Sequence, residues 1–172
     1  MQILIVKGDI TTIPVDAMVN AASPKMRGGG GVDGAIHRAG GPAVLADCIR
    51  RFPAGLAAGE VGWTTAGRLP AQWVIHAVGP NLMAGQTDRQ LLESCYRRCL
   101  QVADRLGAPL VSFPLISAGT YGWPLADAAE TAVTTVINTP CQVQQVIFVA
   151  YSDEARDALN AVASRLSGGA PA

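Results

Sequence analysis

The chain has 172 residues, of which 49% are hydrophobic and only 15% are charged. That composition suits one folded domain with a buried core, and it excludes wholesale disorder. Thirteen Lys and Arg balance thirteen Asp and Glu, so the chain is not expected to bind nucleic acid through bulk charge.

No apolar run approaches the roughly 20 residues that span a bilayer. The start of the chain has four apolar residues after Gln2 and then meets charge, which indicates a first strand and not a signal peptide. A cytoplasmic protein without a membrane partner is therefore expected. Only two of the thirteen basic residues are lysines, and the abundance of Ala, Gly, Arg and Pro is typical of a GC-rich bacterial genome.

Predicted strands and helices alternate along the chain. In chain order they are strands at 3–6 and 17–20, helices at 33–39 and from Pro42, strands at 60–65 and 73–78, a helix at 90–106 stopped by Gly107, a strand at 110–115, a helix at 125–137, a strand at 146–150 and a last helix capped by Ser152 with Leu159, Val162 and Leu166 inward. Strands that are apolar throughout are buried on both faces, which requires helices on both sides of a mixed or parallel sheet. We predict one α/β domain over 1–166 and a disordered tail over 167–172.

Two glycine-containing loops each follow a predicted strand and precede a helix. The first contains Gly28 to Gly31, and the second runs from Ser117 to Trp123. Beyond the carboxyl end of a strand, glycine lets backbone N–H groups approach phosphate oxygens, and a helix N-terminus adds a favourable dipole. Two such loops in one small domain indicate that a diphosphate is held from both sides. Each loop alone also has a simpler explanation, as a turn that needs positive φ.

Asp33 lies inside the first of these loops, where residues 29–34 formally match GxGxxG. A dinucleotide-dependent oxidoreductase is disfavoured, because residues 23–27 separate the loop from its strand and no acidic residue follows about twenty positions later. A carboxylate repels a diphosphate, so a simple phosphate binder would avoid it, whereas an enzyme that activates water there needs it. The alternative is a helix N-terminal residue favoured by the macrodipole.

The remaining polar residues and the cysteines are interpreted one by one: Asp9 has two possible roles, and the others are predicted to be structural. Asp9 either caps a turn or accepts a hydrogen bond from an exocyclic amine such as that of adenine. His37 and His76 lack partners at metal-ligand spacing and are predicted to be structural. Four cysteines without a CxxC pair are expected to be reduced, with Cys95 and Cys99 as small core residues. Neither a metal nor a cofactor is predicted.

Five motifs with chemistry-bearing residues occur in order along the chain. They are Gly8-Asp-Ile-Thr11, Val19-Asn-Ala-Ala22, Gly28-Gly-Gly-Gly-Val-Asp-Gly-Ala-Ile-His-Arg38, Ile75-His-Ala-Val-Gly-Pro80 and Phe113-Pro-Leu-Ile-Ser-Ala-Gly-Thr-Tyr-Gly-Trp-Pro124. In this order, and over about residues 1 to 166, the chain resembles macrodomains of the MacroD type, close to the bacterial O-acetyl-ADP-ribose deacetylases and mono-ADP-ribosyl hydrolases. The resemblance implies a three-layer α/β/α fold around a mixed six-stranded sheet, with an ADP-ribose cleft at the carboxyl ends of the strands.

The resemblance also implies roles for individual residues. Asp9 would bind the adenine amine, the N–H of Ile10 would meet the ring, and Tyr151 would be a nearby aromatic residue. Asp33 would be the catalytic carboxylate. The two loops would clasp the diphosphate and the distal ribose through Gly31, Val32, Asp33, Ser117, Ala118, Gly119, Thr120 and Tyr121.

Ser23 departs from the family motif Val-Asn-Ala-Ala-Asn, in which the last Asn orients the distal ribose beside the catalytic Asp. Serine is shorter and offers one hydroxyl in place of an amide, so ADP-ribose binding is expected to survive while turnover slows. Ser23 therefore counts among the catalytic and ligand-binding candidates.

Two functions follow from these motifs. The first is a hydrolase that removes ester-linked groups from the distal ribose, acting on O-acetyl-ADP-ribose or on proteins ADP-ribosylated at Glu or Asp. The second is a non-catalytic module that binds ADP-ribose or ADP-ribosylated proteins. The intact Gly-Gly-Val-Asp-Gly sequence favours the enzyme, and Ser23 favours the module.

Overall fold

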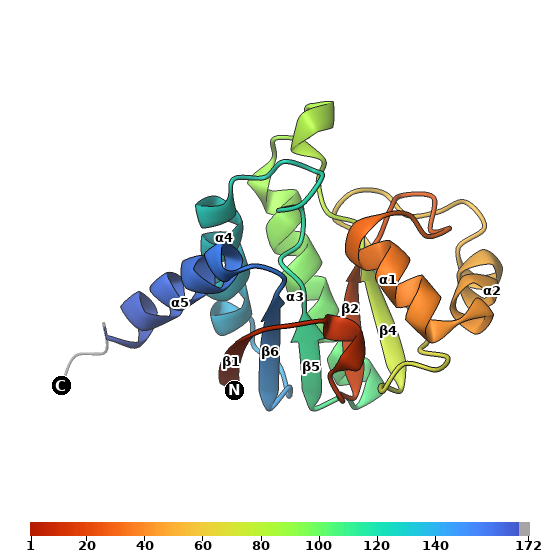
Figure 1. The fold of residues 1–172 in the computed structure, drawn as a ribbon, viewed down its shortest axis with the longest axis horizontal. Helices are drawn as coiled ribbons and strands as arrows, with labels where there is room; N and C mark the ends of the chain where they lie inside the picture. Colours follow the sequence, from red (N-terminus) through yellow and green to blue (C-terminus); the bar gives the residue numbers. More distant parts are fainter. Residues whose placement is uncertain (169–172) are drawn as a thin grey trace.

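Six strands form one mixed sheet in the computed structural model, which describes residues 1–168 (Figure 1). They are β1 (Gln2–Lys7), β2 (Ala17–Ala21), β3 (Val61–Thr65), β4 (Trp73–Ala77), β5 (Leu110–Phe113) and β6 (Gln145–Ala150). Their order across the sheet is β1-β6-β5-β2-β4-β3, and all neighbours are parallel except β3, which pairs antiparallel with β4 at one edge. The predicted mixed six-stranded sheet is confirmed.

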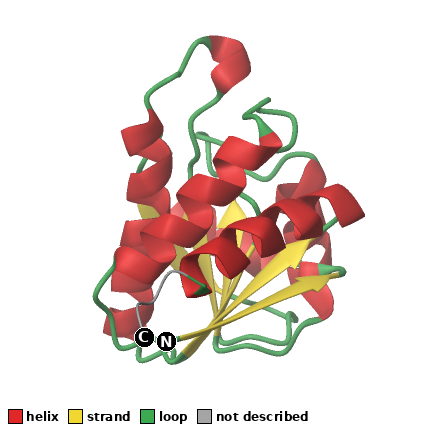
Figure 2. Ribbon diagram, turned by 90° about the vertical axis from the view of Figure 1, so that its left-hand side faces the viewer, coloured by secondary structure: helices red, strands yellow, loops and turns green. Residues whose placement is uncertain are grey.

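Within residues 1–168, five α-helices pack against this sheet, and Figure 2 shows the strands splayed by the twist of the sheet among them. The helices are α1 (Gly31–Gly40), α2 (Pro42–Arg51), α3 (Arg89–Leu106), α4 (Leu125–Asn138) and α5 (Asp153–Ser167), and two short 3-10 helices are η1 (Ile10–Thr12) and η2 (Leu82–Ala84). No helix among residues 1–168 is long and apolar enough to cross a membrane.

The strands bury side chains on both faces, as expected for apolar strands. On β2 and β4, Val19 and Ile75 join the larger core with side chains of α3, α4 and α5. Their neighbours Met18 and Val74 point the other way and join a second core with Ile36 of α1. Because successive side chains of a strand alternate, these two cores define three layers, α/β/α.

The predicted helix ends are confirmed by their local chemistry. Gly107 follows α3 with a φ of 64°, and its N–H donates to the carbonyl oxygens of the last turn. Ser152 caps α5, where its Oγ accepts from the N–H of Ala155 at 3.1 Å.

One inward side chain of α5 was predicted wrongly. Leu159 and Val162 are buried, but Leu166 is 38% exposed, because the last turn of α5 extends past the edge of the sheet (Figure 1). Helix α5 includes Ser167, the first residue of the expected tail, and residues 169–172 lie outside the described residues.

Candidate active site

The two glycine loops lie at the same edge of the sheet. One connects β2 to α1 and the other connects β5 to α4. Strands β2 and β5 pair in parallel, so both loops leave the sheet at its carboxyl edge. The segment after β4 reaches the same edge, since a Cβ added at Gly79 would overlap Ser117 Oγ of the second loop.

The first loop leaves the N-terminus of α1 open to a ligand. Gly30 is the N-cap of α1 and provides no side-chain cap, so the first N–H groups of the helix keep their hydrogen-bonding capacity. Gly31 has a φ of 56°, which explains glycine there on conformational grounds alone. Gly34 lets the loop close onto the helix, because a Cβ at this position would overlap Gly29 O.

Asp33 is buried in the first turn of α1 with only 5% of its surface exposed. Its Oδ1 accepts a hydrogen bond from Asn20 Nδ2 of β2 at 2.8 Å. His37, one helical turn later, places Nε2 3.4 Å from the same oxygen. Among residues 1–168 the structure gives Oδ2 no hydrogen-bond partner. The carboxylate is therefore held through one oxygen, while the second is available to a substrate or to water.

The second loop begins on a fixed support and approaches Asp33. Tyr96 of α3 is fully buried, and its hydroxyl accepts from the N–H of Ile116 at 3.0 Å. Ser117 follows with a φ of 65° and a buried Oγ that has no partner among the described residues. Further along the loop, partial burial and the negative charge of Asp33 raise the pKa of the Tyr121 phenol. The charge of Asp33 thus acts on Tyr121, although the two residues are 88 positions apart in the sequence.

The proposed adenine residues follow two neighbouring strands. Asp9 comes after β1 and Tyr151 after β6, and these strands are joined near their ends by the Gly8 N–H, which donates to Ala150 O at 2.9 Å. Asp9 Oδ1 accepts from Thr11 N at 2.9 Å and from Thr11 Oγ1 at 2.7 Å, which caps η1 and confirms the turn-capping interpretation. Tyr151 is 70% exposed, and Ile10 is buried.

The comparisons with known proteins fit this arrangement. A model of the Macro domain family matches residues 19–132. The chain belongs to the macro domain family. A macro domain-containing protein of Streptomyces coelicolor is 52% identical over 163 residues, which cover 92% of this chain and 96% of the relative. The O-acetyl-ADP-ribose deacetylase of Citrobacter rodentium is 47% identical over 159 residues, covering 89% of this chain and 90% of the relative.

Solved macrodomain structures share the fold over nearly the whole chain. The Oceanobacillus iheyensis macrodomain with ADP superimposes with a TM-score of 0.90 at 35% identity, covering 96% of this chain and 92% of that chain. The Trypanosoma brucei macrodomain in complex with ADP-ribose gives a TM-score of 0.87 at 32% identity, covering 94% and 69%. The predicted macrodomain fold is confirmed.

The Ser23 hydroxyl of this macrodomain makes a hydrogen bond within its own loop. Its Oγ donates to Gly28 O at 3.0 Å and so joins the start of the β2–α1 connection to its glycine run. The hydroxyl stabilises the loop, and contact with a distal ribose stays a prediction.

Two residues beside Asp33 were not among the predicted site residues. Asn20 lies fully buried on β2, and its Oδ1 has no partner among the described residues. A polar residue within an apolar strand was the available signal for Asn20. For His37 the signal was its spacing of four from Asp33, which places both side chains on one helix face. The structural interpretation of His37 missed this contact.

His76 supports Asn20 from the neighbouring strand. Asn20 Nδ2 lies 3.1 Å from His76 Nδ1, and His76 Nε2 lies 2.8 Å from Thr64 Oγ1, which itself donates to Thr65 O. Because the Thr64 hydroxyl directs its proton to that carbonyl, its oxygen accepts from His76 Nε2, which carries the ring proton. His76 Nδ1 then accepts from the Asn20 amide, so the imidazole is neutral. Burial, aided by the charge of His37, lowers the pKa of His76 to about 3. His76 therefore has a structural role, as predicted: it fixes the Asn20 amide that holds Asp33.

The depressed pKa of His76 predicts acid lability. The unfolded chain takes up this proton near pH 6.5 and the folded chain only near pH 3, so His76 leaves stability intact above pH 6.5 and reduces it as the pH falls toward 3. The expected loss in the free energy of unfolding is up to about 1.4 kcal/mol per pH unit in that window. Urea unfolding between pH 7 and 4.5 measures it, with His76→Gln as the non-titrating control. Equal pH slopes for both proteins would contradict the assignment.

Among residues 1–168 no group of three His, Cys, Asp or Glu side chains lies close enough to hold a metal ion. The four cysteines are free thiols, three of them buried.

Proposed function

We propose that this macrodomain binds ADP-ribose and hydrolyses an ester on its distal ribose. The observation that carries the proposal is the buried Asp33 carboxylate in the first turn of α1, held at one oxygen by Asn20 and His37. Support comes from relatives named O-acetyl-ADP-ribose deacetylase and from macrodomain structures solved with ADP-ribose or ADP.

The ligand is proposed to lie along the carboxyl edge of the sheet. Its adenine end contacts Asp9, the N–H of Ile10 and Tyr151, which follow the ends of β1 and β6. Its diphosphate lies at the open N-terminus of α1, opposite the second loop, where N–H groups and the helix dipole favour negative charge. The distal ribose then lies between Asp33 and Tyr121. The loop residues proposed to contact the ligand are Gly31, Val32, Ser117, Ala118, Gly119 and Thr120.

The proposed reaction uses Asp33 as a general base. Its Oδ2 takes a proton from a water molecule, and the oxygen of that water attacks the carbonyl carbon of the ester. The tetrahedral intermediate then breaks its bond to the ribose oxygen, which receives the proton. The products are a carboxylic acid, released as its anion, and a free ribose hydroxyl. Asn20 keeps Oδ1 in place, so the basic oxygen stays oriented throughout.

Two substrate classes carry such an ester. O-acetyl-ADP-ribose would release acetate and ADP-ribose. A protein ADP-ribosylated on Glu or Asp would release ADP-ribose and recover its carboxylate. The proposed partners are therefore ADP-ribose, O-acetyl-ADP-ribose and ADP-ribosylated proteins, and the proposed chemistry uses no cofactor.

The second candidate function is a non-catalytic module that binds ADP-ribose, and Ser23 favours it. Its hydroxyl is engaged with Gly28 O, and it lacks the amide that orients the ribose in the family motif. Incubation of the protein with O-acetyl-ADP-ribose and with a protein carrying ester-linked ADP-ribose separates the two functions. A hydrolase releases acetate or ADP-ribose with turnover. A binding module saturates with ligand and leaves both esters intact.

The Ser23 position also predicts a gain of activity. Ser23→Asn supplies an amide with two donor hydrogens and one acceptor, which is expected to orient the ribose better and to raise the single-turnover rate by up to about a hundredfold, the scale of a 1 Å misplacement. ADP-ribose affinity is expected to stay within a few-fold. Quenched-flow measurement with O-acetyl-ADP-ribose checks the rate, with Ser23→Ala as the matched control for loss of the Gly28 contact. A clear rate loss in Ser23→Asn, together with slowing in Ser23→Ala, would instead indicate a site adapted to serine.

A further inference from the structure

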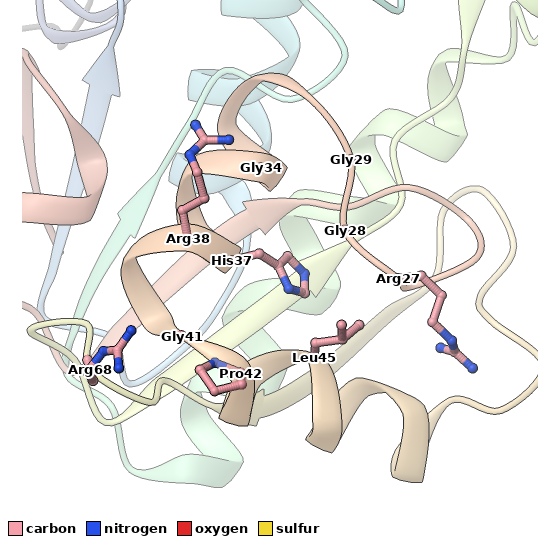
Figure 3. Close-up of a pocket in the computed structure, with 10 residues that line it drawn as sticks. All are labelled: Arg27, Gly28, Gly29, Gly34, His37, Arg38, Gly41, Pro42, Leu45 and Arg68. Carbon is pink, nitrogen blue, oxygen red and sulfur yellow. The ribbon is translucent and has the colours of Figure 1, made fainter.

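A cavity of about 460 Å³ lies beside the first glycine loop, between that loop and helices α1 and α2 (Figure 3). Its walls include Gly28 and Gly29 of the loop and Leu45 of α2. Three arginines surround it from different segments: Arg27 from the glycine loop, Arg38 from α1 and Arg68 from the turn between β3 and β4. The cavity is large enough for one or two side chains of a partner.

Positive charge is concentrated around this cavity, although the chain as a whole has a net charge of zero. No Asp or Glu lines it. Elsewhere in the chain Arg50, Arg51, Arg89, Arg97, Arg156 and Arg165 pair with acidic side chains. Within residues 1–168, no such pair includes the exposed side chains of Arg38 and Arg68.

Arg27 contributes a charge that is fixed in position but not neutralised. Its Nη1 donates to the carbonyl oxygens of Met26 at 3.0 Å and of Phe52 at 3.1 Å. These acceptors are uncharged, so the guanidinium keeps its positive charge, although Figure 3 shows it directed away from His37 and Leu45. A local excess of one sign in a concave surface attracts ligands of the opposite sign.

The cavity shares a wall with the proposed catalytic carboxylate. His37 lines the cavity and also approaches Asp33 Oδ1 at 3.4 Å. Gly29 lines it too, and a Cβ at this position would lie 3.2 Å from Asp33 Oδ2. A group attached to the distal ribose beside Asp33 is therefore separated from the cavity by a single layer of residues.

We propose that this arginine-rimmed cavity binds acidic side chains that neighbour the modified residue of an ADP-ribosylated protein. The proposal rests on the proposed function, since it concerns the part of the same substrate that lies beyond the distal ribose. Guanidinium groups pair with carboxylates in a bidentate manner. Figure 3 shows the guanidinium groups of Arg38 and Arg68 well apart from each other, and that of Arg27 on the opposite side and directed outward. That spacing suits several carboxylates along a peptide better than a single phosphate group.

The test compares three substrates: O-acetyl-ADP-ribose and two peptides with one ester-linked ADP-ribose each, flanked by acidic or by neutral residues. The wild-type protein is expected to reach half-saturation at about fivefold lower concentration of the acidic peptide, the scale of two exposed ion pairs. In Arg38→Glu/Arg68→Glu this preference disappears or reverses, while turnover of O-acetyl-ADP-ribose stays within about twofold. Added salt weakens the preference in the wild type.

A matched control distinguishes binding at this cavity from a general effect of the protein's net charge. Arg98→Glu/Arg105→Glu changes the net charge equally, at exposed positions of α3, and is expected to keep the preference. The proposal is overturned if the wild type treats both peptides alike, or if this control loses the preference to the same extent. Absence of O-acetyl-ADP-ribose turnover by the wild type would count against the hydrolase function alone. The preference is then measured as the ratio of the two peptides' binding affinities, with the same expectations.

Discussion

Replacing Asp33 with alanine is expected to lower the single-turnover rate of ester hydrolysis by about 10²–10⁴-fold, the range for loss of a general base. The reason is the position of the side chain, which is buried, fixed through Oδ1 and without a hydrogen bond at Oδ2 among the described residues. Affinity for ADP-ribose is expected to change little or to increase, because a negative charge beside the diphosphate is removed. Rapid-quench kinetics and calorimetry measure the two quantities separately.

The matched control for this experiment is Asp33→Asn. It retains the volume of the side chain and an oxygen that accepts from Asn20, but it cannot take a proton from water. Its rate is expected to fall as far as that of Asp33→Ala. Hydrolysis by Asp33→Asn at the wild-type rate would remove Asp33 from the role of base.

The second large effect is expected at the adenine end of the site. Asp9→Ala is expected to weaken ADP-ribose binding by roughly 1.5–3 kcal/mol, the scale of a hydrogen bond to a charged group. Hydrogen bonds from the Thr11 hydroxyl and N–H lower the pKa of Asp9, which keeps it charged at neutral pH. Both bonds reach Oδ1, so Oδ2 is left to accept from an exocyclic amine. Calorimetric titration with ADP-ribose gives the change in affinity.

A conservative variant distinguishes ligand binding from turn capping at this position. Asp9→Asn keeps an oxygen that can accept from Thr11 and replaces Oδ2 with an NH₂ group, which cannot accept. It is expected to lose affinity nearly as much as Asp9→Ala while its thermal stability stays near that of the wild type. Wild-type affinity in Asp9→Asn would restrict Asp9 to capping η1.

Much of the fold was predictable because its determinants are local. Gly107 and Ser152 stop and start helices through hydrogen bonds within a few residues, and apolar runs mark the buried strands. The order of the strands in the sheet could not be predicted in this way, because it depends on pairing between distant segments. Strand β3 alternates buried and half-buried residues, but only the assembled sheet shows that it is an antiparallel edge strand beside β4.

In the candidate site, too, some contacts follow from local sequence spacing and others only from the assembled sheet. The pair of Asp33 and His37 depends on helical spacing, which the sequence already contains. The contact of Asn20 with His76 depends on register, since these residues are direct partners across β2 and β4. No pattern in the sequence specifies that pairing before the sheet is assembled.

The arginine-rimmed cavity was not predictable for a similar reason. Arg27, Arg38 and Arg68 belong to a loop, a helix and a turn, and each alone is an ordinary basic residue in a chain of zero net charge. Only the fold brings these three residues to one cavity, next to Asp33.

The most direct test of the account is a calorimetric titration of the full chain with ADP-ribose. The paired glycine loops, the open N-terminus of α1 and the Asp9 carboxylate predict saturable binding at one site with a micromolar dissociation constant, which corresponds to about −8 kcal/mol. AMP, which lacks the distal ribose and one phosphate group, is expected to bind more weakly. A titration without saturable heat would contradict both the hydrolase and the binding-module functions.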